Sequence, residues 1–156
     1  MKSRLNAICR PKGFKASARA CGLKKKDRLD LALIYSEVPA LACGMFTTNK
    51  IAAHPVKICK LHLKGRLAQA IVVNSGNANC YTGEKGRAIT EKTAELSARL
   101  LEIPKERALI ASTGIIGKVP DFAKIRLAIP GLVKSLNGKD GSRAAEAIMT
   151  TDTHPK

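Results

Sequence analysis

The sequence predicts an α/β fold, or an α+β fold with a mixed sheet, in a single domain of 156 residues. Short apolar runs, typical of buried strands, alternate only partly with segments of helical apolar periodicity, which favours a mixed sheet over a purely parallel one. Hydrophobic residues make up 45% of a chain long enough to bury a sizeable core. Aromatic residues make up only 3%, so we expect an aliphatic core.

Four apolar segments are predicted to form strands. They cover residues 29–36, 42–48, 66–74 and 107–111, and the pattern of 66–74 is the strongest. A turn is expected at Val38-Pro39, between the first two of these segments. The segment 54–60 alternates in polarity and is expected to be half exposed, as a strand at a surface is.

Amphipathic helices are predicted over residues 84–101 and 122–136, and a short last helix over 142–148. Thr82 is the expected N-cap of the first helix and Ser142 that of the last, because a hydroxyl there can accept from a free backbone N–H group. Pro130 is expected to kink the second helix. Residues 1–28 are basic and are expected to be irregular.

The charge balance is strongly basic. The chain holds 28 Lys and Arg against 12 Asp and Glu, a net charge of +16. This charge is typical of a nucleic-acid or acidic-ligand surface, and equally of a solvated lysine-rich face. Sequence-tolerant binding of single strands usually needs stacking aromatic residues, which are scarce here. A nucleic-acid partner is therefore not favoured.

Other classes are excluded on simple grounds. No apolar run reaches the roughly 18 residues of a membrane span, and the N-terminal residues lack the apolar core of a signal peptide. A cytoplasmic protein without a membrane partner is expected. The five cysteines include no CxxC pair, and the three histidines show no metal-ligand spacing. We expect reduced thiols that mostly fill the core, with no metal and no cofactor.

Two small polar turns follow apolar strands. The first, residues 74–79, reads Asn-Ser-Gly-Asn-Ala-Asn, and the second, residues 112–117, reads Ser-Thr-Gly-Ile-Ile-Gly. Glycine lets backbone approach a ligand closely, so Gly114 beside the Thr113 hydroxyl could form an oxyanion hole. A plain βα turn is the better interpretation from spacing alone.

Other polar groups have two interpretations each. Asn74, Asn77 and Asn79 could line a ligand pocket, or mimic backbone hydrogen bonds in a left-handed turn, which the pattern alone favours. Thr150 lies in a polar run that could bind a carboxylate or amide, or cap a strand. Cys80 has no histidine nearby in the sequence, so a buried thiol is a better interpretation than a nucleophile.

Several ordered runs together carry a more specific signal. They cover residues 11–16, 30–34, 44–49, 70–79, 111–117 and 147–153. At this order and spacing they resemble the N-terminal, α-chain portion of the ornithine acetyltransferase / glutamate N-acetyltransferase family of arginine biosynthesis. The resemblance covers nearly the whole chain and implies part of a layered αββα-type fold.

The resemblance implies a mechanism. In this family a precursor cleaves itself at an Ala-Thr bond, and the new N-terminal Thr of the β chain is the nucleophile. It takes acetyl from N-acetylornithine and passes it to glutamate through an acetyl-threonine intermediate, and some members also use acetyl-CoA as donor. The family's oxyanion donors map to Thr113 and Gly114, and a substrate-binding Thr maps to Thr150. Asn74, Asn77 and Asn79 are then expected to shape the pocket wall.

The chain also departs from the family pattern. It contains neither the Lys-Gly substrate-binding run nor the cleavage junction, so the nucleophile is expected beyond Lys156. Residues 1–156 would then hold half an active site and be inactive alone, with the β chain as partner in an α2β2 heterotetramer. The alternative is a basic, non-catalytic nucleic-acid-binding or fragmentary protein that retained the fold.

Overall fold

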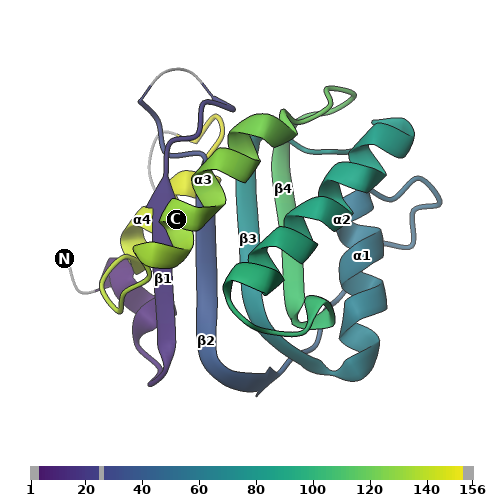
Figure 1. Cartoon of the computed structure of the whole chain (residues 1–156). Helices are drawn as coiled ribbons and strands as arrows, with labels where there is room; N and C mark the ends of the chain where they lie inside the picture. Colours follow the sequence, from purple (N-terminus) through teal and green to yellow (C-terminus); the bar gives the residue numbers. More distant parts are fainter. Residues whose placement is uncertain (1–3, 25–26, 153–156) are drawn as a thin grey trace.

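The fold is that of a computed structural model, which describes residues 4–24 and 27–152. Four strands and four α-helices account for most of the chain (Figure 1). In chain order the elements are η1 (Arg4–Cys9), β1 (Phe14–Arg19), β2 (Leu31–Leu41), α1 (His54–His62), η2 (Leu63–Gly65), β3 (Leu67–Asn77), α2 (Gly83–Leu100), η3 (Lys105–Arg107), β4 (Ala108–Ile115), α3 (Phe122–Lys134) and α4 (Gly141–Ile148).

The strands form one mixed sheet in the order β1-β2-β3-β4. β2 is antiparallel to β1 and to β3, whereas β3 and β4 are parallel and are joined through α2. A parallel pair needs such a crossover, because its second strand must start again at the same end of the sheet. The predicted α+β fold with a mixed sheet is therefore confirmed, and the carboxyl ends of β3 and β4 meet at one edge.

Helices cover the two faces of the sheet unequally. Side chains of α1, α2 and α3 pack on one face, and α2 and α3 cross in front of the strands in Figure 1. The buried core on this face includes Leu31, Leu33, Val72, Ile110, Ile58, Ala94, Ile129 and Leu132. The smaller cluster on the other face joins α4 to the first three strands, through Ala16, Ala18, Ala32, Val73, Ala144 and Ala147. Among the described helices, none has both the length and the apolar content to cross a membrane.

The predicted turn at Val38-Pro39 and the predicted strand 42–48 are wrong. β2 runs on through Pro39 to Leu41, and the residues after it have no regular structure. Proline lacks an N–H donor and is tolerated in a strand where the ladder is irregular. The register of β2 against β3 shifts between Tyr35 and Ala40, which is the irregularity that accommodates Pro39.

The alternating segment 54–60 is also not a strand. It forms the helix α1, with Pro55 in the first turn, where a missing N–H group costs nothing. Its buried residues Pro55, Ile58 and His62 follow a helical spacing of three and four. Seven residues of alternating polarity are too few to distinguish the two-residue period of a strand from the 3.6-residue period of an α-helix.

The basic segment 1–28 is more ordered than expected. It contains η1 and the strand β1, in which Ala16, Ser17 and Ala18 are buried. Small residues have weak strand propensity, so the pairing with β2 and the cover by α4 decide the conformation. Residues 1–3 and 25–26 of this segment lie outside the described residues.

The predicted helices are confirmed, but their caps differ. Thr82 stands at the N-cap position of α2 without a capping hydrogen bond, because its hydroxyl donates to Asn79 Oδ1. α4 begins after Asp140 rather than at Ser142. The carboxylate of Asp121 caps α3 by accepting from the next two free N–H groups of that helix.

Candidate functional site

The two polar turns of the sequence lie side by side at the carboxyl edge of the parallel pair. In the register of β3 and β4, Ser75 lies opposite Thr113 and Gly76 opposite Gly114. β4 therefore continues as a strand through the predicted turn, up to Ile115. Ligands commonly bind where parallel strands end, because the backbone there is not covered by further sheet.

Gly76 and Gly114 are needed for the close approach of these two strands. Gly114 has φ +128°, and a Cβ atom there would lie 2.4 Å from the carbonyl carbon of Gly76. Gly76 has φ +103°, and its Cβ would lie 2.9 Å from the Leu23 oxygen. No side chain fits at either position, so bare backbone lines this edge.

The alternation of backbone groups along β4 predicts the direction of the Gly114 N–H group. In a strand the backbone groups of successive residues alternate in direction. Ile115 faces β3, because its oxygen accepts from Ala78 N at 3.0 Å, whereas Ile110 faces outward and bonds the Cys59 thiol of α1. Regular alternation from Ile110 predicts that the N–H group of Gly114 also faces away from β3.

The Thr113 hydroxyl is available as a second donor. Thr113 is half-buried, and its side chain projects from the sheet face opposite to that of Ser112 and Gly114. Within the described part of the chain its hydroxyl makes no hydrogen bond. An unengaged hydroxyl is a donor that a developing oxyanion could use.

A hollow of about 760 Å³ opens in front of this edge. Gly76, Gly114 and Ile115 line it from the strand ends, and Thr150 and Thr151 line it from the segment after α4. The structure thus brings Gly114 and Thr150, 36 residues apart, to one cavity. Thr113 adjoins Gly114 in the sequence but is not among the residues that line the hollow. The roles predicted for Thr113, Gly114 and Thr150 stay predictions.

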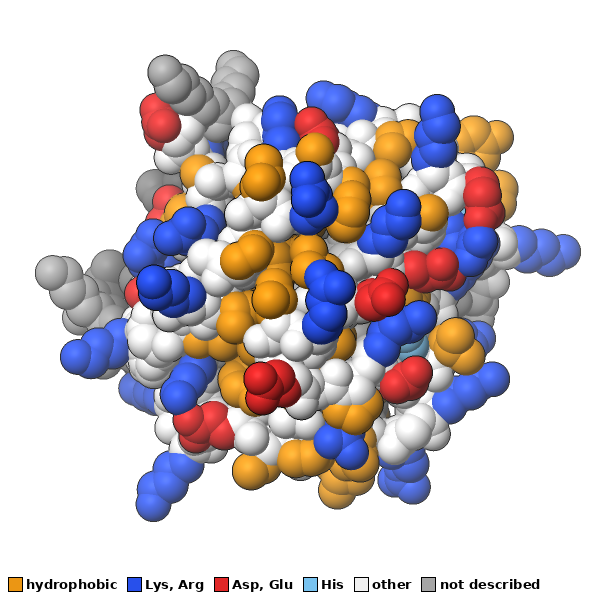
Figure 2. Space-filling model, viewed as in Figure 1, with side chains coloured by type: hydrophobic (Ala, Val, Ile, Leu, Met, Phe, Trp, Pro, Cys, Tyr) orange, Lys and Arg blue, Asp and Glu red, His pale blue; other side chains and the backbone are white. Residues whose placement is uncertain are grey.

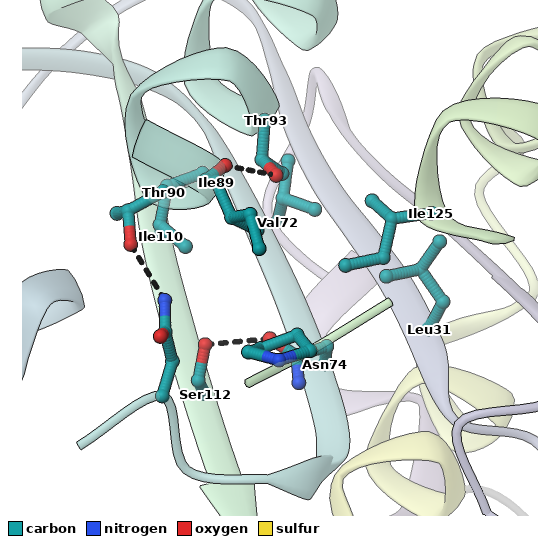
Figure 3. Close-up of a pocket in the computed structure, with 11 residues that line it drawn as sticks. Leu31, Val72, Asn74, Ile89, Thr90, Thr93, Ile110, Ser112 and Ile125 are labelled. Atoms are coloured by element: carbon teal, nitrogen blue, oxygen red, sulfur yellow. Dashed lines mark hydrogen bonds between the residues drawn. The ribbon is translucent and has the colours of Figure 1, made fainter. Parts of the chain in front are cut away.

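The three asparagines do not line this hollow. Asn74 and Asn79 line a separate internal cavity of about 10 Å³, the size that one water molecule requires (Figure 3). In Figure 3 the Asn74 amide oxygen accepts from the Ser112 hydroxyl. Asn79 Nδ2 donates to Thr90 Oγ1 at 2.8 Å. These bonds tie β3 to β4 and to α2, so Asn74 and Asn79 serve the scaffold rather than the wall of the hollow.

Asn77 differs from its two neighbours. It is buried, and its Nδ2 is the only buried side-chain nitrogen or oxygen atom of the described residues without a hydrogen-bond partner. The backbone carbonyl of Asn77 is held in place, because its oxygen accepts from Asn74 Nδ2 at 3.0 Å. A buried amide nitrogen without an acceptor costs free energy, so the side chain of Asn77 destabilises the fold at this position.

A buried carboxylate organises the loop on the other side of the hollow. Asp30 has no exposed surface, and its oxygens accept from the N–H groups of Cys21 at 2.7 Å, Leu23 at 2.7 Å and Lys24 at 3.0 Å. Gly22, Leu23 and Lys24 line the hollow. Sequence reasoning missed this role, although an acid at the start of an apolar strand was a usable signal.

We expect Asp30→Ala to lower the free energy of unfolding by about 3 kcal/mol or more, because each buried donor left without an acceptor costs about 1–3 kcal/mol. The matched control is Asp121→Ala, since Asp121 caps an exposed helix start with bonds to only two N–H groups. That cap is worth about 1 kcal/mol. Urea denaturation followed by circular dichroism measures both, and equal losses would contradict the anchoring role.

The thiol of Cys21, beside the hollow, is not a nucleophile near neutral pH. Burial, followed by the Asp30 carboxylate, raises the pKa of the Cys21 thiol to about 12, so it is neutral near pH 7. All five cysteines are free thiols; Cys9, Cys21 and Cys59 pack against the cores, whereas Cys43 is exposed. The described residues contain no group of three His, Cys, Asp or Glu side chains that could hold a metal ion.

Comparison with known proteins identifies the family. Residues 15–156 match the sequence model of the ArgJ family. The chain belongs to the ArgJ family. The arginine biosynthesis bifunctional protein ArgJ of Thermosynechococcus vestitus is 46% identical over 146 residues, which cover 93% of this chain and 35% of that protein. The ArgJ protein of Rhizobium meliloti is 41% identical over 145 residues, with the same coverage. The chain thus spans about a third of the length of these ArgJ relatives.

Solved structures of ArgJ relatives share the fold. The ornithine acetyltransferase of Mycobacterium tuberculosis, complexed with ornithine, superposes with a TM-score of 0.93 at 36% identity, covering 97% of this chain and 82% of that chain. The ArgJ protein of Bacillus halodurans superposes with a TM-score of 0.90 at 34% identity, covering 97% and 79%. The resemblance stated from the ordered runs is therefore confirmed at the level of family and fold.

Proposed function

We propose that this chain is the α-chain portion of a glutamate N-acetyltransferase, an acyltransferase of arginine biosynthesis. The enzyme moves acetyl from N-acetylornithine, and in a second mode from acetyl-CoA, to glutamate. The observation that carries the proposal is the meeting of Gly114 and Thr150 at one hollow in a chain of the ArgJ family. The solved relative that holds ornithine supports an ornithine-derived donor.

The proposed chemistry divides between this chain and its partner. The hydroxyl oxygen of an N-terminal threonine, supplied by the β chain of the same precursor after autocatalytic cleavage, attacks the acetyl carbonyl carbon. The amide C–N bond breaks, ornithine leaves as an amine that takes up the threonine hydroxyl proton, and an acetyl-threonine ester remains. The amine of glutamate then attacks this ester, which gives N-acetylglutamate and restores the threonine hydroxyl. Each attack places negative charge on the carbonyl oxygen, which the Gly114 N–H group and the Thr113 hydroxyl stabilise as an oxyanion hole. Thr150 binds substrate across the hollow.

The sheet supports the proposed partner, because part of one face lacks a cover. Period-two alternation puts Ile34, Ile71 and Ile115 on the face that carries α4. Ile71 lies in an inner strand yet is 36% exposed, and Ile115 is 59% exposed. We infer that the C-terminal part of the precursor packs here as a second sheet of the αββα fold, in an α2β2 heterotetramer. A cytoplasmic location goes with this role.

The basic charge does not favour the nucleic-acid alternative. Figure 2 shows Lys and Arg side chains spread over this face of the molecule and interleaved with acidic and apolar ones. Electrostatic binding of nucleic acid works best along a continuous basic stripe. No such stripe crosses this view.

Complementation tests the proposed function. The isolated chain is expected to transfer no acetyl from N-acetylornithine to glutamate, because it lacks the nucleophile, and co-expression with the C-terminal part of its precursor is expected to restore transfer. Product formation is followed by mass spectrometry with labelled acetyl. Robust turnover by the isolated chain would refute the proposal that it holds only half of an active site. A complemented complex that forms but stays inactive would refute the proposed acetyltransferase activity.

A further inference from the structure

We propose that the hollow contains a binding site for an anionic oxygen group, a carboxylate or a phosphate, formed by Lys24, Arg28 and Lys118. These three side chains line the hollow together with Gly114 and Thr150. Among the described residues that line it, none is acidic. A cavity whose charges all have one sign attracts the opposite sign, because its walls reduce the screening by water.

The position of Lys24 is fixed from two sides. Its backbone N–H group donates to Asp30 Oδ2, and its ammonium donates to Met149 O at 2.8 Å, next to Thr150 in the sequence. The lysine therefore spans the hollow from the loop to the segment after α4. An ammonium held in place loses less conformational freedom on binding an anion than a mobile surface lysine does.

The charge on Lys24 is not neutralised at this site. Burial, followed by the neighbouring Arg28 guanidinium, lowers the pKa of the Lys24 ammonium below its ordinary value. The nearby acids Asp30 and Glu146 act in the opposite sense, but Asp30 is already engaged by three N–H groups. Lys24 is half-buried and Arg28 is exposed, and two such neighbouring cations gain stability when an anion binds between them.

The size of the hollow indicates the kind of ligand. About 760 Å³ is far more than one inorganic ion occupies and lies within the range of small-molecule sites. The anionic group is therefore one end of a larger molecule whose other end reaches Gly114. The carboxylate of an amino acid and the phosphate of a nucleotide-like acyl carrier share this chemistry. The choice of these two ligands rests on the proposed function, whereas the anion site itself rests on the residues that line the hollow.

An NMR titration of the ¹⁵N-labelled chain tests the site with glutamate in one arm and pyrophosphate in the other. We expect saturable shifts of the Gly22, Gly76 and Gly114 amide signals. Lys24→Gln combined with Lys118→Gln is expected to weaken the affinity about ten-fold or more, the usual effect of losing a hydrogen bond to a charged group. Tighter binding of glutamate assigns the site to a carboxylate, and tighter binding of pyrophosphate assigns it to a phosphate.

The matched control is Lys105→Gln, which removes the same charge from an exposed lysine in η3, before β4 begins and thus at the opposite end of that strand. An equal loss of affinity in this control, or shifts that do not saturate, would overturn the proposal, because attraction by the net charge alone would then account for binding. Lys118→Gln alone serves if the double variant unfolds, since Lys118 is exposed. Binding is measured without acetyl transfer, so failure of this site and failure of the proposed function are separate results.

Discussion

The Thr113→Val variant, in complex with the C-terminal part of the precursor, is expected to lose about 100- to 1,000-fold in turnover, the usual cost of removing one oxyanion donor. The substitution keeps the size and β-branching of the side chain and removes only the hydroxyl. That hydroxyl makes no hydrogen bond within the described residues, so the free energy of unfolding is expected to change by less than about 0.5 kcal/mol. Steady-state kinetics and urea denaturation of the same preparation measure the two effects.

The matched control is Thr90→Val, the same change at a threonine with a structural role. Thr90 is buried, and its hydroxyl donates to Gly86 O at 2.9 Å and accepts from Asn79 Nδ2. This variant is expected to lose about 1–2 kcal/mol of stability and to keep its turnover per folded molecule. A raised KM with an unchanged kcat in Thr113→Val would contradict an oxyanion role, because a group that binds ground state and transition state alike affects mainly KM.

Local patterns sufficed for elements whose own residues determine their conformation. α2 was predicted to within a residue at each end and β3 except for its last three residues, because long apolar or amphipathic runs leave no competing period. α1 was misread because its nine residues, His54–His62, contain only two helical turns, and alternation over seven of them resembled a strand. β1 was missed because its buried core is Ala-Ser-Ala, which favours a strand only when β2 and α4 are present.

The site was predictable in part. The sequence singled out residues 74–79, 112–117 and Thr150, but the two predicted turns are largely strand, and only the parallel register of β3 and β4 puts Gly76 opposite Gly114. The asparagines have another use, since Asn74 accepts from the Ser112 hydroxyl of β4 and Asn79 donates to Gly86 O of α2. Lys24 was part of a diffuse charge in the sequence, and its place in the hollow depends on Asp30, a contact that no local pattern encodes.

The Gly114→Ala variant of the chain is expected to lose about 2–4 kcal/mol of folding free energy, through overpacking against the facing strand together with a disfavoured positive φ. Its new Cβ would lie 2.4 Å from the Gly76 carbonyl carbon, which is backbone and cannot move aside as a flexible side chain does. Urea denaturation gives the loss, and hydrogen exchange is expected to show that the amides of β3 and β4 near this edge open first.

Gly117→Ala separates the two causes, because Gly117 also has a positive φ, +79°, but no atom lies within 4 Å of a Cβ built there. It is expected to lose about 1 kcal/mol, the conformational cost alone. If both variants lose the same amount, β3 and β4 can move apart without cost, and the contact at Gly76 does not fix the position of the Gly114 N–H group. A large difference between them means that the strand pairing itself holds this donor in place, before any substrate or partner chain is bound.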